Sequence, residues 1–283
     1  MTNELLGVRV EVAAPGFHVR KPVIAGPLPG GLGHLVADRS RAILSVIGVG
    51  TFAVEGGHRI RFQPDADVPT GALSAWLHGT VMALLLAQRG QFALHASVVN
   101  VGGKGVAVAG FQRAGKSTTA LRLGQRGHSF VTDDVSPVVT GDPVVVHPST
   151  RPIHVHPEPA ATLGLDVSDA RPVVADHSKL ALALASHDPV PLGTIAVLEA
   201  SDPSVSVETV RARGVRAHWL IGQHTYRVGL LRELWQVEMF VWAGEIADRV
   251  PVYLVTRPSG RWSVDAVAEA VEHVALTDTR TEP

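Results

Sequence analysis

Eight consecutive residues, 110–117, have the types and spacing needed to hold a chain of phosphates. They read GFQRAGKS and match the pattern G-x-x-x-x-G-K-[ST] of a phosphate-binding loop, or P-loop. Gly110 and Gly115 let backbone N–H groups approach the phosphates, and the helix expected after the loop points its N-terminus at them. Lys116 is predicted to reach the β- and γ-phosphates, and Ser117 to place its hydroxyl on Mg²⁺. The loop therefore predicts a site for ATP and Mg²⁺.

The surroundings of this loop make the match more specific than the pattern alone. An apolar run, KGVAVAG, precedes the loop, and a helical stretch follows it. A Gly-containing turn before an ordinary helix is the alternative. The residues predicted to contact the nucleotide are Gly110, Phe111, Gln112, Arg113, Ala114, Gly115, Lys116, Ser117 and Thr118.

Two adjacent carboxylates, Asp133 and Asp134, end the next expected strand, HSFVTDD. In a P-loop sheet this position lies near the phosphates. One carboxylate can then hold Mg²⁺, while the other takes a proton from an acceptor hydroxyl. A pair of Asp residues at a turn or helix cap is the alternative interpretation.

The elements that must position these residues alternate in the manner of an α/β fold. Short Val- and Ile-rich strands fill the first sixty-odd residues, and strand, loop, helix and strand follow one another around the P-loop. We expect a β-rich N-terminal region over 1–69, a P-loop domain over 70–276 and a disordered tail over 277–283. The expected strands are 7–14, 41–50, 50–64, 94–101, 104–110, 128–134, 193–200 and 250–258, and the expected helices are 70–89, 116–127, 226–249 and 264–276.

Composition excludes several other classes of protein. The net charge of −1 gives no basic footprint for nucleic acid, and the absence of Cys excludes disulfides and thiolate zinc sites. The start, residues 1–12, is not a signal peptide, and the longest apolar stretch, 81–87, is too short to span a membrane. We therefore expect a cytoplasmic protein with no membrane or nucleic-acid partner.

Fourteen His residues invite a metal interpretation. His147, His154 and His156 cluster, and a strand would place the last two on one face. We favour the interpretation that these His residues lie on a polar strand face or in a loop, because no further metal ligands lie near them in the sequence. Arg151 and Lys179 are weaker candidates for cations near the phosphates or the acceptor, with a solvated surface charge as the alternative.

Residues 94–138 resemble the P-loop core of HPr kinase/phosphorylase and its kinase-like relatives. The family has a His in a short L/M-H-G/A stretch, a Gly-containing hairpin, a Walker A loop, a helix ending R-G-H and a strand ending D-D. The matching positions, in the same order, are His95, Gly102-Gly103, residues 110–117, Arg126-Gly127-His128 and Asp133-Asp134.

The resemblance implies a fold related to the nucleotide domain of phosphoenolpyruvate carboxykinase. It also implies phosphoryl transfer from a nucleotide to a Ser hydroxyl of a peptide or protein. By the same resemblance, Asp133 is the general base, His95 is its partner and Asp134 serves the metal with Ser117. The order of the two Asp roles stays open, as does assembly into a homo-oligomer, which the family often shows.

Several departures from the family pattern narrow this expectation. Gln112 and Arg113 stand where the family loop usually has Ser-Gly. If that Gly position needs positive φ, Arg113 costs about 1 kcal/mol or more; alternatively, its guanidinium adds a phosphate contact. The N-terminal portion looks like shorter relatives found with peptide natural-product clusters, some of which phosphorylate a precursor peptide. These departures speak against HPr as the acceptor and against the reverse phosphorylase reaction.

Two other functions remain compatible with the sequence. One is a P-loop module that holds nucleotide as a regulatory ligand, which the altered loop supports and the Asp pair opposes. The other is an NTPase that uses water as the acceptor.

Replacing Lys116 with Ala is expected to weaken triphosphate binding and abolish turnover while the fold stays intact, because Lys116 supplies charge to the β- and γ-phosphates. Isothermal titration with a non-hydrolysable triphosphate measures the first effect. Unchanged affinity together with unchanged turnover would remove the P-loop interpretation.

Overall fold

The computed structural model describes residues 8–12, 17, 24–28, 31–148, 152–168, 170–173, 176–182 and 188–277. The chain divides into two compact units, Met1–Phe92 with Arg227–Phe240 and Ala93–Tyr226 with Val241–Pro283. A division by compactness does not test which segments fold independently, so the boundary after residue 69 stays a prediction. Arg151 and residues 278–283 lie outside the described residues.

The first unit is built on a six-stranded sheet. Gly56 and Gly57 both have positive φ, 58° and 72°, as a tight turn between twisted strands requires, and they join β5 to β6 in the expected hairpin. Neighbouring strands pair antiparallel except β1 and β6, which are parallel. The sheet order is β1 (Arg9–Val12), β6 (Arg59–Pro64), β5 (Gly50–Glu55), β4 (Arg41–Val46), β3 (Gly33–Ala37) and β2 (Ile24–Pro27).

The helix expected over 70–89 is present but interrupted. It consists of α1 (Thr70–Trp76), a π-type segment, η3 (Leu77–Val81), and α2 (Met82–Gln88). Gly79 has non-helical backbone angles at the interruption. The helix contacts β5, where the Gln88 side chain donates to the Val54 carbonyl and accepts from the Gly57 N–H.

The same helix corrects the expectation that no apolar segment reaches membrane-spanning length. Thr70–Gln88 has 19 residues and a mean hydropathy of 1.4, so it meets that criterion by length and composition. A core helix of a soluble protein meets it as well. Residues 83–87 are all buried, whereas none of Thr70–Trp76 is, and 44% of the apolar window is buried in all.

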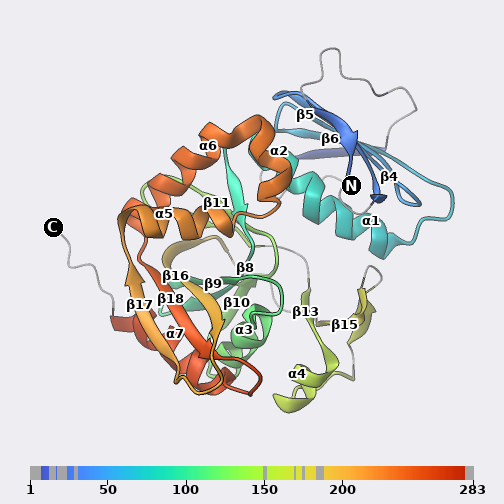
Figure 1. The fold of residues 1–283 in the computed structure, drawn as a ribbon. Coiled ribbons are helices and arrows are strands. Elements are labelled where there is room, and N and C mark those ends of the chain that lie inside the picture. Colours follow the sequence, from blue (N-terminus) through green and yellow to red (C-terminus); the bar gives the residue numbers. More distant parts are fainter. Residues whose placement is uncertain are drawn as a thin grey trace. The chain divides into compact units, whose positions relative to one another are not determined.

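The second unit contains the P-loop and a larger mixed sheet (Figure 1). Its central strand, β16, pairs in parallel with β9 on one side and β18 on the other. β8 and β10 continue antiparallel beyond β9, and β17 pairs antiparallel with β18. The strands are β7 (Phe92–Leu94), β8 (Ala96–Val101), β9 (Lys104–Gly110), β10 (Ser129–Thr132), β11 (Ser136–Val139), β12 (Val145–Val146), β16 (Val190–Ser201), β17 (Glu208–Ala212) and β18 (Val252–Pro258).

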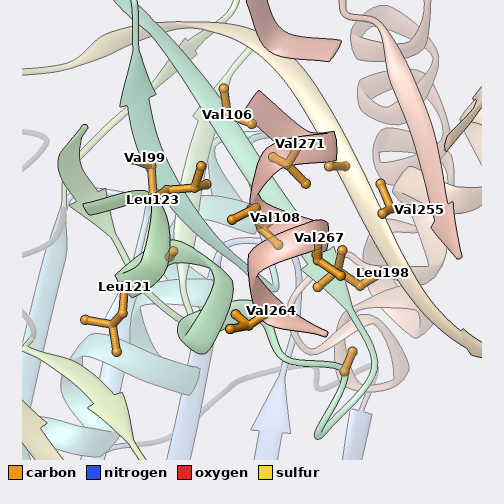
Figure 2. Close-up of a cluster of buried hydrophobic side chains, with 14 of the residues drawn as sticks. Val99, Val106, Val108, Leu121, Leu123, Leu198, Val255, Val264, Val267 and Val271 are labelled. Carbon is orange, nitrogen blue, oxygen red and sulfur yellow. The ribbon is translucent and has the colours of Figure 1, made fainter. Parts of the chain in front are cut away.

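Helices α3 (Lys116–Gln125) and α7 (Val264–Thr277) pack against each other and against this sheet. A cluster of buried hydrophobic side chains lies between these helices and the sheet. Val106 and Val108, alternate residues of β9, belong to it together with Leu123 of α3 and Val271 of α7 (Figure 2). Removing this apolar surface from water holds α3, and therefore the P-loop before it, against the end of β9.

Further elements complete the second unit. A three-stranded sheet runs in the order β13 (Ile153–Val155), β15 (Asp176–Leu182) and β14 (Arg171–Val173), with α4 (Pro157–Thr162) between β13 and β14 in the chain. Helix α5 (Gly214–Gln223) was not expected from the sequence. The long helix expected next is α6 (Val228–Arg249), whose residues up to Phe240 belong to the first unit and whose later residues belong to the second. A non-helical residue, Trp235, lies inside it. The described residues thus form a mixed α/β structure with three sheets.

Shortening Leu123 to Ala is expected to lower the free energy of unfolding by about 2–5 kcal/mol, because the side chain is fully buried and leaves a cavity. The urea-unfolding midpoint measures the loss. Leu276→Ala is the matched control, since that side chain on α7 is 54% exposed. An equal loss in both variants would contradict the packing described here.

Candidate functional site

The P-loop connects the end of β9 to the start of α3, and its two glycines are required for different reasons. At Gly110, with φ of 147°, a Cβ would lie 2.8 Å from the Ala114 Cβ and 2.9 Å from the Leu198 carbonyl oxygen. At Gly115 there is open space, but its φ of 102° is disfavoured for any other residue. Gly110 therefore allows the loop to pack against β16, and Gly115 allows the turn into the helix.

Arg113 adopts positive φ, 65°, at the position where the resembled family has Gly. This left-handed conformation costs a non-Gly residue about 1–2 kcal/mol. The guanidinium of Arg257, at the end of β18, stabilises this loop conformation with two hydrogen bonds. Its Nε–H donates to the Ala114 carbonyl at 2.9 Å, and its Nη2–H donates to the Arg113 carbonyl at 3.3 Å. Sequence reasoning missed Arg257, because an Arg at a strand end carries no motif.

Lys116 lies at the first position of α3. Its ammonium donates to the carbonyls of Gly110 at 3.0 Å and Phe111 at 3.3 Å. Burial lowers the pKa of Lys116, and the carboxylates of Asp134 and Asp133 oppose that shift. The amino group thus lies inside the loop, at the point where the phosphates are predicted.

Asp133 is buried and accepts hydrogen bonds from three separate segments. Ser97 Oγ of β8 and Ser117 Oγ of α3 donate to its Oδ1, the latter at 3.0 Å, and the backbone N–H of His154 donates to Oδ2 at 3.2 Å. Burial raises the pKa of Asp133, although the Ser97 hydrogen bond acts in the opposite direction. Sequence reasoning missed Ser97, whose only signal is a hydroxyl on a strand of otherwise apolar residues.

Asp134 follows with positive φ, 67°, so the two adjacent carboxylates point to different partners. His95 Nδ1 lies 3.1 Å from Asp134 Oδ1 and 3.2 Å from the Asp134 carbonyl oxygen. The contact expected between His95 and Asp133 is therefore made with Asp134 instead. Both side chains of this pair are about one-third exposed, at 32% and 35%.

The backbone around His95 is held by the segment that follows α5. The His95 N–H donates to the His224 carbonyl at 2.7 Å, and the Tyr226 N–H donates to the Ala93 carbonyl at 2.8 Å. The buried His224 ring packs edge-on against Phe111, with centroids 4.9 Å apart. Burial, followed by the charge of Lys116, lowers the pKa of His224 to about 4, so His224 is neutral at physiological pH. This segment carries no recognisable motif, and sequence reasoning missed it.

One pocket of about 520 Å³ brings most of these groups together. Lys179, a weak candidate by sequence, also faces it, whereas Gly110, Phe111 and Ala114 do not line it, and the Phe111 side chain is 64% exposed. The lining residues are His95, Gln112, Arg113, Gly115, Lys116, Ser117, Thr118, Asp133, Asp134, His154, Val155, His156 and Lys179.

The His cluster found in the sequence divides in the structure. His154 and His156 line the pocket, and His147 does not. Within the described ranges, no group of three or more His, Asp or Glu side chains is arranged to hold a metal ion by itself.

The chain was compared with known protein families, curated proteins and solved structures, and only the solved structures contain a similar protein. No family model matches the chain, and no curated protein does. Among solved structures, the chain is similar to the Hpr(Ser) kinase/phosphatase from Coxiella burnetii, with 15% sequence identity and a TM-score of 0.35, over 65% of this chain and 93% of that one. This is a distant structural relationship.

Replacing Asp133 with Asn is expected to stabilise the nucleotide-free protein relative to the wild type at neutral pH, because Asn cannot ionise at this buried position. Burial raises the folded-state pKa of Asp133 above its ordinary value of 3.8, so the folded protein binds this proton more tightly than the unfolded chain. The stability of the wild type then falls as pH rises from 3.8 through the folded-state pKa, and the Asn variant does not share that fall.

Urea unfolding in EDTA across this pH range measures the difference between the two proteins. The advantage of the variant should be near zero at acid pH and grow to a plateau. Asp188→Asn, at an exposed position, is the control and should show no pH-dependent difference. A variant that is destabilised at every pH would contradict the buried, raised-pKa carboxylate.

Proposed function

We propose that this protein is an ATP- and Mg²⁺-dependent kinase that transfers the γ-phosphoryl group to a Ser hydroxyl of a peptide or protein. The observation that carries the proposal is the single pocket in which the P-loop Lys116 and Ser117 meet two carboxylates with different partners. We further propose that it acts as a soluble protein in the cytoplasm.

The oxygen groups at the base of the pocket fit a magnesium ion. Ser117 Oγ and Asp133 Oδ1 lie 3.0 Å apart, and hydroxyl and carboxylate oxygens are ligands that Mg²⁺ prefers. Mg²⁺, when bound there, neutralises charge on the phosphate oxygens during transfer. Asp133 would hold it directly or through water, in the position that the resemblance gave to Asp134.

The second carboxylate has the properties of a general base. Asp134 is partly exposed to the pocket, and His95 Nδ1 contacts its Oδ1. This contact orients the carboxylate, which takes the proton of the acceptor hydroxyl as the hydroxyl attacks the γ-phosphorus. Asp134 is thus proposed as the base, and His95 as the residue that aims it.

The cationic lining suits a triphosphate rather than a neutral substrate. Lys116, Arg113 and Lys179 all face the pocket. These three cationic side chains outnumber the two carboxylates of the pocket, and Mg²⁺ would add to the positive excess, so the pocket attracts an anion. The same cations would stabilise the negative charge on the equatorial oxygens of the transferring phosphoryl group.

A transfer assay tests the function directly. The protein is incubated with Mg²⁺ and γ-labelled ATP, together with a peptide mixture that carries a fixed central Ser or with the matched mixture that carries Ala. A kinase labels only the Ser mixture. ADP without labelled peptide would indicate an NTPase, and bound nucleotide without ADP would indicate a regulatory binding module.

The two carboxylates are separated by paired variants. Asp134→Asn should lower transfer by about 10²-fold or more and His95→Ala by about 10- to 100-fold, with nucleotide affinity nearly unchanged in both, because both act on the proton and not on the phosphates. Asp133→Asn should instead raise the Mg²⁺ concentration needed for half-maximal rate. Transfer rate against Mg²⁺ concentration reads out both effects, and the opposite pattern would restore Asp133 as the base.

A further inference from the structure

A second hollow of about 180 Å³ lies beside the P-loop within the same unit. One side is formed by the loop and the first turn of α3, including Gly115 and Thr118. The other side is formed by the connection from β18 to α7, including Arg257, Trp262 and Val264. Nothing in the proposed phosphate chemistry uses this hollow.

The two hollows share a wall. Gly115 and Thr118 line both the phosphate pocket and this second space. A ligand whose phosphates lie against Lys116 and Ser117 can therefore extend past Thr118 into the second hollow. Gly115 has no side chain and leaves open space where a Cβ would stand, so it does not obstruct that passage.

The lining of the second hollow suits a flat heteroaromatic ring. Trp262 is 47% exposed, while Val264 and Val267 supply buried apolar surface. The two guanidiniums nearby are engaged with backbone, since Arg257 donates to the Ala114 carbonyl and Arg261 donates to the Val205 carbonyl. The hydroxyl residues Thr118, Thr119 and Ser263 also line the hollow, and an indole in such a lining can stack on any base.

We propose that this second hollow binds the nucleobase of the nucleoside triphosphate, with the indole of Trp262 stacking on the base. The inference rests on the nucleotide binding proposed above and adds where the base is held. Trp262 is then a binding residue for the base and has no contact with the phosphates. Its loss should therefore affect ligands that carry a base and spare those that consist of phosphate alone.

Isothermal titration of the full chain with two Mg²⁺-bound ligands tests this. One ligand is a non-hydrolysable ATP analogue, and the other is inorganic tripolyphosphate. Trp262→Ala should weaken the analogue by about tenfold or more, the scale of one lost base-stacking contact, and leave tripolyphosphate within about twofold. Trp262→Phe should retain most of the affinity. Trp219→Ala, at another exposed Trp on α5, is the matched control and should change neither ligand.

The outcomes separate this inference from the proposed function. An unchanged affinity for the analogue in Trp262→Ala, or an equal loss for both ligands, overturns the base site. Wild-type protein that binds the analogue no more tightly than tripolyphosphate overturns the base site alone and leaves the phosphate site standing. Binding of neither ligand overturns both. Binding of the ATP analogue that depends on Trp262, together with no labelled Ser peptide in the transfer assay, supports the base site and removes the kinase function.

Discussion

The buried carboxylate of Asp133 is the point on which the rest of the site depends. An ionised group removed from water is costly unless its lone pairs are satisfied. Here Ser97, Ser117 and the His154 N–H satisfy them, and these donors come from β8, α3 and β13. One side chain thus ties the P-loop helix to the sheet and to the β13 segment that lines the pocket. The pKa of Asp133 remains raised by burial, so the arrangement holds a group that favours a nearby cation.

Two of the four non-Gly residues with positive φ in the described part of the chain line the pocket beside this carboxylate. Arg113 and Asp134 both occupy the left-handed region without being Gly, and both line the pocket. Such residues persist where their surroundings hold them, and they gather at functional sites. Arg257 holds the loop side through the Ala114 and Arg113 carbonyls, and His95 holds the Asp134 side. The left-handed conformation of Asp134 turns the two neighbouring carboxylates toward different partners.

An element of the fold or a residue of the site could be predicted only where its pattern lies within a short stretch of sequence. The strand and helix that flank residues 110–117 and the hairpin at Gly56 follow from short patterns, and the structure contains each of them. Phosphate binding by the loop stays a prediction. The contact of His95 with Asp134 instead of Asp133 could not be predicted, because it depends on the positive φ of Asp134. Ser97, Arg257 and His224 were missed for a related reason: each reaches the site through tertiary packing. Interruption of the helix at Gly79 likewise overrides a helical pattern that is continuous in sequence.

The division of roles proposed for the two carboxylates rests on the hydrogen bonds that each carboxylate accepts. Oδ1 of Asp133 already accepts from two hydroxyls and Oδ2 accepts from a backbone N–H, so little capacity remains for a proton from a third hydroxyl. A cation can still share this oxygen-rich position, because the Ser117 hydroxyl beside it is itself a suitable ligand. Asp134 differs in its access to solvent: its side chain is partly exposed, and His95 contacts its carboxylate. An acceptor hydroxyl that entered from solvent would reach the more exposed Asp134 before the buried Asp133, and this difference in access is the physical reason to propose Asp134 for the proton and Asp133 for the metal.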